Sequence, residues 1–277
     1  MIIPEEILST IKENKGIRKN FINKTKYFYG SDSKPKWKKN KNKKDRSYYL
    51  DNPIEYKFNN SGYRTFDDFD QKNKGVVTLG CSFTEGIGLH LEDVWSYKIA
   101  KHLDKPLYNL AVGGKGIRDS FERLVSFGDY LDYDYVFLFV PPKGRVSIYF
   151  GDNRIVHSSD YPELSDKGDY FDFLPSTQND IDLVKYKTIL FNGSKFEEYF
   201  YQFTYLNLIK YYLQSRGKVL IYETWNNLNQ LYSMKNKDEI ICKDIEARDG
   251  HWGTKKQHFI YELFIKKYEE LNSNRSS

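Results

Sequence analysis

From residue 75 onward, short apolar runs alternate with longer stretches in which apolar side chains recur every three or four positions. Short apolar runs are typical of buried strands, and the longer spacing is typical of amphipathic helices. The expected strands are 76–79, 107–112, 135–140 and 219–222, and the expected helices are 93–103, 117–131, 195–215 and 254–271. Because strand and helix alternate, the pattern predicts an α/β domain at 75–277 with three layers and a mainly parallel sheet.

Two regions depart from this alternation. Residues 1–74 form an N-terminal extension with an expected short helix at 4–15. At 54–69, aromatic and polar residues alternate around a turn, which indicates a small hairpin or an extended lead-in. Arg64 in this lead-in is expected on the surface, as a single arginine usually is. Residues 141–194 are rich in turn-forming and aromatic residues, and we interpret them as an insertion over the crevice of the sheet.

Composition narrows the class of protein. The chain has 277 residues, 39% of them hydrophobic and 17% aromatic, which is enough for a sizeable core. No apolar run approaches the roughly 18 residues that span a bilayer, and the N-terminus lacks the apolar centre of a signal peptide. These features predict a cytoplasmic protein without a membrane partner. Cys81 and Cys242 are too few for a disulfide framework or a four-cysteine zinc site, and neither a metal nor a cofactor is expected.

The positive charge is concentrated in one segment. Residues 34–46 carry a net charge of +7, which leaves −2 for the remainder of a chain whose total is +5. A basic run that contains Trp37 has the composition to bind nucleic-acid phosphates in a salt-dependent manner. No nucleic-acid motif accompanies it, so a solvated, flexible arm is the preferred interpretation and nucleic acid is a minor alternative.

A candidate nucleophile follows the first strand of the α/β domain. The apolar run 76–79 ends in Gly80-Cys81-Ser82. In an open parallel sheet, the loops beyond the carboxyl ends of the strands form the ligand crevice, so Ser82 is placed where a nucleophile would work. The alternative is that Ser82 merely caps the helix that follows, since serine is a preferred N-cap residue.

A serine hydroxyl needs a base, and histidine is the commonest one. Of the five histidines, only His251 lies in a loop just ahead of an expected helix and close to an acid, Asp249. A carboxylate that orients a histidine is the arrangement of a catalytic triad. The alternative is an ordinary polar turn at 249–251.

Stabilisation of an oxyanion requires preorganised hydrogen-bond donors. The segment 109–116, Asn-Leu-Ala-Val-Gly-Gly-Lys-Gly, presents glycine backbone N–H groups where the second strand leads into its helix. A phosphate-binding loop is the alternative, but the glycine spacing fits neither the dinucleotide nor the P-loop pattern. We therefore take Asn109, Gly113 and Gly114 as candidate oxyanion or substrate-binding residues.

These three segments, in this order, resemble the SGNH (GDSL-like) hydrolase superfamily over about residues 75–271. Segments 80–86, 109–114 and 249–251 look like its first, second and last blocks, with Cys81 where the family often has aspartate. The resemblance implies a flavodoxin-like α/β/α sandwich in which Ser82 attacks an ester carbonyl and His251 transfers the proton. It further implies that Asp249 orients His251, and that the N–H groups of Ser82 and Gly114 hold the oxyanion.

The chain departs from the family pattern in two places. The third block should supply an asparagine, but residues 140–145 read Val-Pro-Pro-Lys-Gly-Arg, so Arg145 or Lys143 is expected to substitute as a cationic donor unless activity is slow or lost. The acid also stands two residues before the histidine instead of three, which leaves Asp244 or Glu246 as alternatives to Asp249.

The sequence thus predicts a serine esterase or acyl hydrolase that acts on an ester, with O-acetyl or other O-acyl groups of a carbohydrate as candidate substrates. Two alternatives remain open. One is a noncatalytic module that binds a carbohydrate or an acylated ligand, and the other is an acyltransferase that uses the same residues. The oligomeric state is not predicted.

Overall fold

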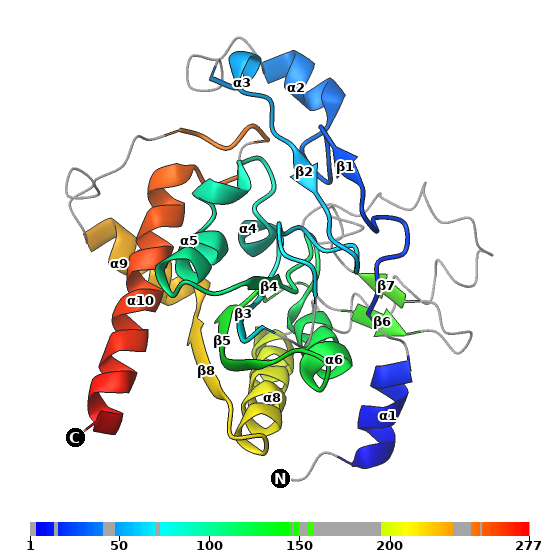
Figure 1. Cartoon of the computed structure of the whole chain (residues 1–277), viewed down its shortest axis with the longest axis vertical. Coiled ribbons are helices and arrows are strands. Elements are labelled where there is room, and N and C mark those ends of the chain that lie inside the picture. The colour runs from blue at the N-terminus through cyan, green and yellow to red at the C-terminus, as the bar shows by residue number, and fades with distance from the viewer. Residues whose placement is uncertain are drawn as a thin grey trace.

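The computed structural model describes residues 4–13, 16–40, 48–69, 73–143, 145, 147–149, 155–157, 195–234, 245–249 and 251–276. Its centre is a four-stranded parallel sheet with the strand order β4-β3-β5-β8 (Figure 1). The strands are β3 (Gly75–Leu79), β4 (Leu107–Asn109), β5 (Tyr133–Phe139) and β8 (Val219–Glu223). The expected strands therefore exist, although β4 is shorter than predicted, and the α/β class is confirmed.

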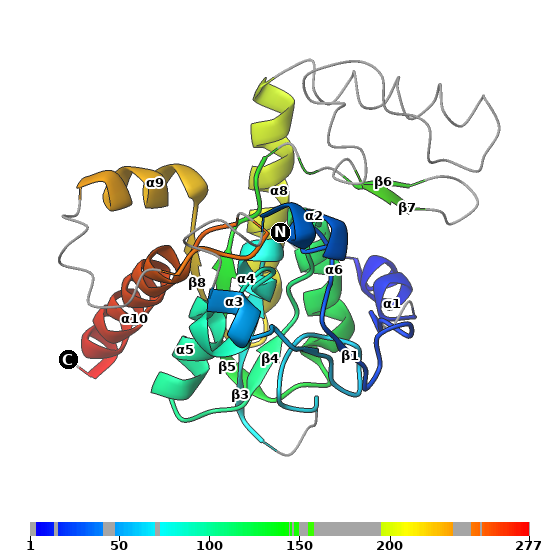
Figure 2. The same ribbon diagram turned by 90° about the horizontal axis from the view of Figure 1, so that it is seen from above.

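Helices pack against the sheet through two core clusters. Among the described residues, the α-helices after β3 are α4 (Ser82–Glu85), α5 (Trp95–His102), α6 (Ile117–Gly128), α8 (Lys195–Gln214), α9 (Trp225–Met234) and α10 (Thr254–Ser276). One cluster joins Val77 of β3 to buried residues of α6 and α8, and the other joins Val76 to buried residues of α5 and α10. Because successive strand residues point to opposite faces, α6 and α8 cover one face of β3, and α5 and α10 cover the other (Figure 2).

The N-terminal extension carries small elements of its own. They are α1 (Glu5–Glu13), β1 (Thr25–Lys26), α2 (Lys34–Asn40), α3 (Tyr48–Asp51) and β2 (Tyr56–Lys57). β2 pairs antiparallel with β1, so the partner of the lead-in is an upstream strand. The hairpin predicted at 54–69 is reduced to one isolated bridge between Phe58 and Arg64. In Figure 1, β1, β2, α2 and α3 lie together beyond the end of the sheet where α4 begins.

One expectation for this extension was wrong, and a second holds only in part. Arg64 is only 1% exposed, and its guanidinium donates hydrogen bonds to the carbonyls of Glu85, Gly86 and Leu89, so it is part of the interior. The first part of the basic segment is helical: the lysines of α2 are exposed, while Trp37 packs against an aromatic cluster. Residues 41–47 of the basic segment lie outside the described residues, and its binding to nucleic acid stays a prediction.

Most of the insertion at 141–194 also lies outside the described residues. Its described parts include β6 (Ser147–Tyr149) and β7 (Ile155–His157), which pair antiparallel. Within the part of the chain that the structure covers, no helix combines the length and the hydrophobicity needed to cross a bilayer.

Candidate active site

Ser82 is the first residue of α4 and follows β3 after a tight turn. Gly80 has φ of 151°, and a Cβ atom there would collide with Thr84 and with the carbonyl of Phe139, so only glycine fits. The N-cap of α4 is Cys81, which makes no side-chain cap. Ser82 is therefore not the capping residue. Its Oγ lies 2.9 Å from Nε2 of His251, although the two residues are 169 positions apart in sequence.

His251 is held by Asp249 through two contacts. Nδ1 of His251 lies 2.5 Å from Oδ2 of Asp249, and the backbone N–H of His251 donates to Oδ1 at 3.0 Å. The two-residue spacing thus lets one carboxylate meet both the ring and the backbone of the histidine. Of the alternative acids, Asp244 lies outside the described residues, and Glu246 is exposed. The chain from Ser82 through His251 to Asp249 has the connectivity of a triad.

The environment of Asp249 favours its ionised form. Burial of this side chain raises its pKa, but hydrogen bonds from His251 and Ser31, with the charge of His251, lower it by more, and the pKa ends below the ordinary value of 3.8. The hydroxyl of Ser31, from the N-terminal extension, donates to Oδ2 at 2.5 Å. An ionised Asp249 is the state that can accept the Nδ1–H of a histidine acting as a base.

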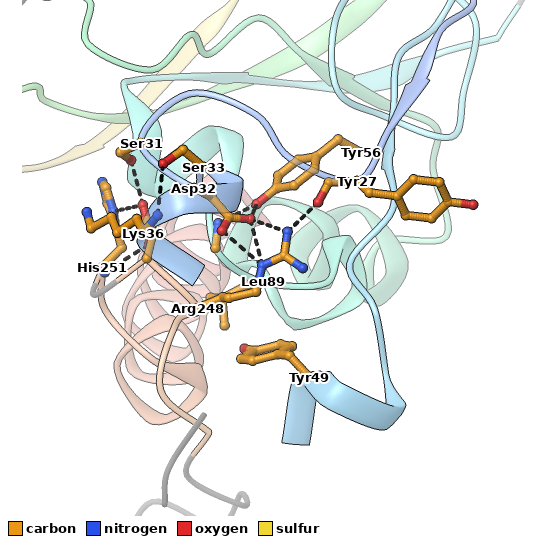
Figure 3. A network of polar contacts seen from close by, with 12 residues as sticks. Tyr27, Ser31, Asp32, Ser33, Lys36, Tyr49, Tyr56, Leu89, Arg248 and His251 are labelled. Carbon is orange, nitrogen blue, oxygen red and sulfur yellow. Dashed lines mark hydrogen bonds and ion pairs between the residues drawn. The ribbon is translucent and has the colours of Figure 1, made fainter. Parts of the chain in front are cut away.

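A buried ion pair anchors the segment that carries Asp249. Nε of Arg248 lies 2.9 Å from both carboxylate oxygens of Asp32, and both side chains are almost fully buried. Tyr56 adds a hydroxyl bond to the same carboxylate at 2.5 Å. Figure 3 shows that these contacts join the N-terminal extension to the loop that ends in His251. Four groups of the network, Ser31, Asp32, Tyr56 and Arg248, therefore fix the base side of the site.

The candidate oxyanion donors are backbone N–H groups. Gly114 has φ of 79°, a left-handed conformation that favours glycine. Within the described residues, no acceptor takes a hydrogen bond from the backbone N–H of Ser82 or of Gly114. The N–H of Gly113, in contrast, donates to Oε2 of Glu85 at 2.5 Å. While that bond exists, the N–H of Gly113 is occupied, so Gly114 is the better candidate donor of this loop.

The contacts of the other predicted residues are with neighbours other than Ser82. Asn109 is fully buried, and its amide is engaged with Thr78, Thr84 and backbone groups, so it supports the loop and does not face a ligand. The carbonyl of Arg145 lies against Gly116, and its Nη1 is enclosed without a hydrogen-bond partner. Nζ of Lys143 lies 3.5 Å from the ring centre of Tyr199. Within the described residues, no hydrogen bond joins Lys143 or Arg145 to Ser82.

Three half-buried aromatic rings that the sequence did not identify stand beside His251. The ring of Phe83 lies 4.6 Å, centre to centre, from the rings of His251, Trp225 and Trp252. We call Phe83, Trp225 and Trp252 the aromatic wall. It gives the base side of the site an apolar surface.

Sequence reasoning also missed Ser31 and Glu85. Ser31 is separated from Asp249 by 218 positions and belongs to no motif, so no sequence signal could have found it. Glu85 does lie inside the Gly80–Gly86 segment, three residues after Ser82, where a carboxylate on the first turn of a helix could have drawn notice. Among the described residues, no group of three or more metal-ligating side chains is present.

Searches against family models, curated proteins and solved structures find no match to this chain.

Proposed function

We propose that this protein is a serine esterase of the SGNH type, built as a flavodoxin-like three-layer α/β/α sandwich. The observation that carries the proposal is the contact of 2.9 Å between Ser82 Oγ and His251 Nε2, continued by 2.5 Å from His251 Nδ1 to Asp249. These distances join a hydroxyl, a base and an orienting carboxylate at the end of a parallel strand, where α/β proteins bind ligands.

The proposed reaction follows from this geometry. Nε2 of His251 accepts the proton of Ser82 while Oγ attacks the ester carbonyl, and Asp249 stabilises the imidazolium that forms. The N–H groups of Ser82 and Gly114 donate to the oxyanion of the tetrahedral intermediate. As the intermediate collapses, His251 returns the proton to the leaving alcohol. A water molecule, deprotonated by His251, then hydrolyses the acyl-serine and restores the hydroxyl.

We place O-acyl groups of carbohydrates first among the candidate substrates. The aromatic wall supports this choice, because sugar rings present apolar faces that pack on aromatic side chains. The substrate would lie with its carbonyl at Ser82 and its alcohol portion near His251, which donates the proton to the leaving oxygen. An acyltransferase would use the same residues and a sugar hydroxyl in place of water, and product analysis with candidate acceptors distinguishes the two.

A noncatalytic binding module is the second candidate, and one observation favours it. The third-block position lacks an asparagine, and no hydrogen bond between described residues brings Lys143 or Arg145 to Ser82 in its place. Loss of one oxyanion donor slows comparable enzymes by about 100-fold or more. The esterase and the binding module therefore differ in whether the two backbone donors suffice for turnover.

Hydrolysis of short-chain aryl acetates tests the esterase. Ser82→Ala and His251→Ala are each expected to reduce kcat by at least about 1000-fold, because each removes a partner in proton transfer. His258→Ala is the matched control, since His258 also faces a carboxylate, Glu262 at 3.6 Å, but stands on α10 away from Ser82. Equal rates in the wild-type protein and Ser82→Ala would rule out the esterase. Binding of acylated sugars without turnover would instead support the binding module.

A further inference from the structure

Glu85 is a fully buried acid that stands three residues after Ser82 and outside the triad. Both of its carboxylate oxygens are engaged. Oε2 accepts the backbone N–H of Gly113 at 2.5 Å. Oε1 accepts hydrogen bonds from Arg18 at 3.0 Å and from the hydroxyl of Tyr29 at 2.9 Å. The side chain of Glu85 has no exposed surface, and that of Arg18 is 15% exposed.

A charged group in this position needs a physical reason. Burying a carboxylate is costly unless an opposite charge and hydrogen bonds compensate, and here both partners on Oε1 come from the N-terminal extension. An apolar side chain at the end of α4 would avoid that cost. What Glu85 provides is a charge-assisted acceptor for one backbone N–H, which is stronger than a neutral one.

That N–H belongs to the loop that carries the proposed oxyanion donor. Gly113 lies against the nucleophile, since a Cβ atom placed on it would stand 3.6 Å from Cβ of Ser82. Gly113 and Gly114 are consecutive glycines, the most flexible pair a backbone can have. Oxyanion donors are effective only when they are held in position before the reaction. A hydrogen bond that fixes Gly113 restricts the peptide next to the donor of Gly114.

We propose that Glu85 is a positioning residue for the oxyanion loop, and that Arg18 and Tyr29 hold Glu85 in place, so that the N-terminal extension completes the active site. This inference rests on the proposed esterase function. Glu85 touches neither substrate nor reacting atoms in this role. It acts through Gly113 on the neighbouring N–H of Gly114.

Kinetics of two variants and one control test the proposal. Glu85→Gln keeps the shape but removes the charge that Arg18 and the Gly113 N–H require, and kcat is expected to fall about 10-fold or more with KM nearly unchanged. Tyr29→Phe removes one donor to Oε1 and should lower kcat by about threefold to tenfold. Tyr63→Phe is the control: its hydroxyl bonds the carbonyl of Gly16 at 2.7 Å and anchors the same extension without touching Glu85.

A readout that does not depend on activity separates this inference from the proposed function. Val112–Gly113 is the only Val-Gly pair in the sequence, so carbonyl-13C valine with 15N-glycine labelling identifies the Gly113 amide by NMR. The short bond to a carboxylate should place this amide proton downfield in the wild-type protein. Glu85→Gln should move it upfield, and Tyr63→Phe should leave it unchanged.

The outcomes are distinct. A kcat for Glu85→Gln no lower than that of Tyr63→Phe, or a Gly113 proton that does not move, would overturn the positioning role while leaving the triad intact. Absence of Ser82-dependent turnover with an upfield shift in Glu85→Gln would overturn the esterase and retain Glu85 as the residue that orders a ligand-binding loop.

Discussion

On one side of Ser82, His251 and Asp249 hold each other through side chains, and on the other side lies a loop with two glycines whose backbone N–H groups are the proposed oxyanion donors. The base side is fastened from outside the α/β domain, by Ser31 on Asp249 and by Asp32 on Arg248. The proposed oxyanion side is held from within the α/β domain, because Glu85 accepts a hydrogen bond from the backbone N–H of Gly113. Because Arg18 and Tyr29 of the N-terminal extension hold Glu85, both sides depend on this extension, through different contacts.

The two sides differ in what the proposed chemistry requires of the sequence. Proton transfer requires particular side chains, so Ser82 and His251 are recognisable as residue types. Backbone donors require only a conformation, and any sequence that holds the conformation serves. Under the proposed function, residues 140–145 supply no asparagine donor, so the backbone donors depend more heavily on what fixes the loop.

The largest effect on the base side is expected from Asp249→Asn. His251 Nδ1 and Ser31 Oγ both meet Oδ2, whereas the backbone N–H of His251 meets Oδ1. An asparagine that keeps its oxygen for the backbone N–H must present its NH2 group to Nδ1, which forces the imidazole into the tautomer with its proton on Nε2. That tautomer cannot accept the proton of Ser82. A loss of kcat by about 10⁴-fold is expected in the aryl acetate assay.

Glu246→Gln is the control for that prediction. Glu246→Gln, an exposed acid three positions earlier, should leave kcat within about twofold of wild type, because surface substitutions away from a site change little. An equal loss in both variants would mean that the acid is not assigned to one position, and an unchanged kcat in Asp249→Asn would remove Asp249 from the mechanism.

A smaller effect on the same side is expected from Ser31→Ala. The substitution removes one of the hydrogen bonds to the carboxylate of Asp249, a contribution of about 1 kcal/mol, or about fivefold in kcat/KM. Ser33→Ala is the matched control, because the hydroxyl of Ser33 accepts a bond from the backbone of Lys36 at 3.4 Å and does not contact Asp249. If the two variants have the same kcat/KM, the base side does not depend on the extension through Ser31.

Much of the fold could be predicted, because a strand or helix buried in a parallel sheet leaves a periodic pattern. β3, β5, β8, α8 and the start of α10 lie within a few residues of their predicted bounds. α9 was missed, since Trp225–Met234 contains three asparagines, which favour turns over helices. Of the two alternatives at 54–69, the hairpin is reduced to one bridge, because alternation predicts a strand but not its partner, which for β2 is β1.

The residues of the candidate site also differ in whether the sequence could predict them. Ser82 and His251 could be predicted because motif, residue type and position relative to strand and helix agreed. Arg18, Ser31 and Arg64 could not, because a single arginine or serine in an irregular segment is usually a surface residue. Their contacts are with residues far away in the sequence: Arg18 is separated from Glu85 by 67 positions, and Ser31 from Asp249 by 218.

The smallest expected effect concerns stability instead of rate, and it separates the charge of Asp249 from its shape. Because folding lowers the pKa of Asp249 below 3.8, this group stabilises the fold in full above that pH and loses its contribution as the pH falls through the lower folded value. The difference in free energy of unfolding between wild type and Asp249→Asn, measured by urea denaturation, should therefore stay constant from pH 6 to about 4.5 and shrink toward pH 3.

Lys74 and Asp134 form an exposed pair whose partners approach to 3.0 Å, and Asp134→Asn should show a much weaker trend, since surface pairs contribute little. A difference that grows as the pH falls would mean that the carboxyl group is protonated more readily in the folded protein, and the hydrogen bonds from His251 and Ser31 would then not hold Asp249 as an anion.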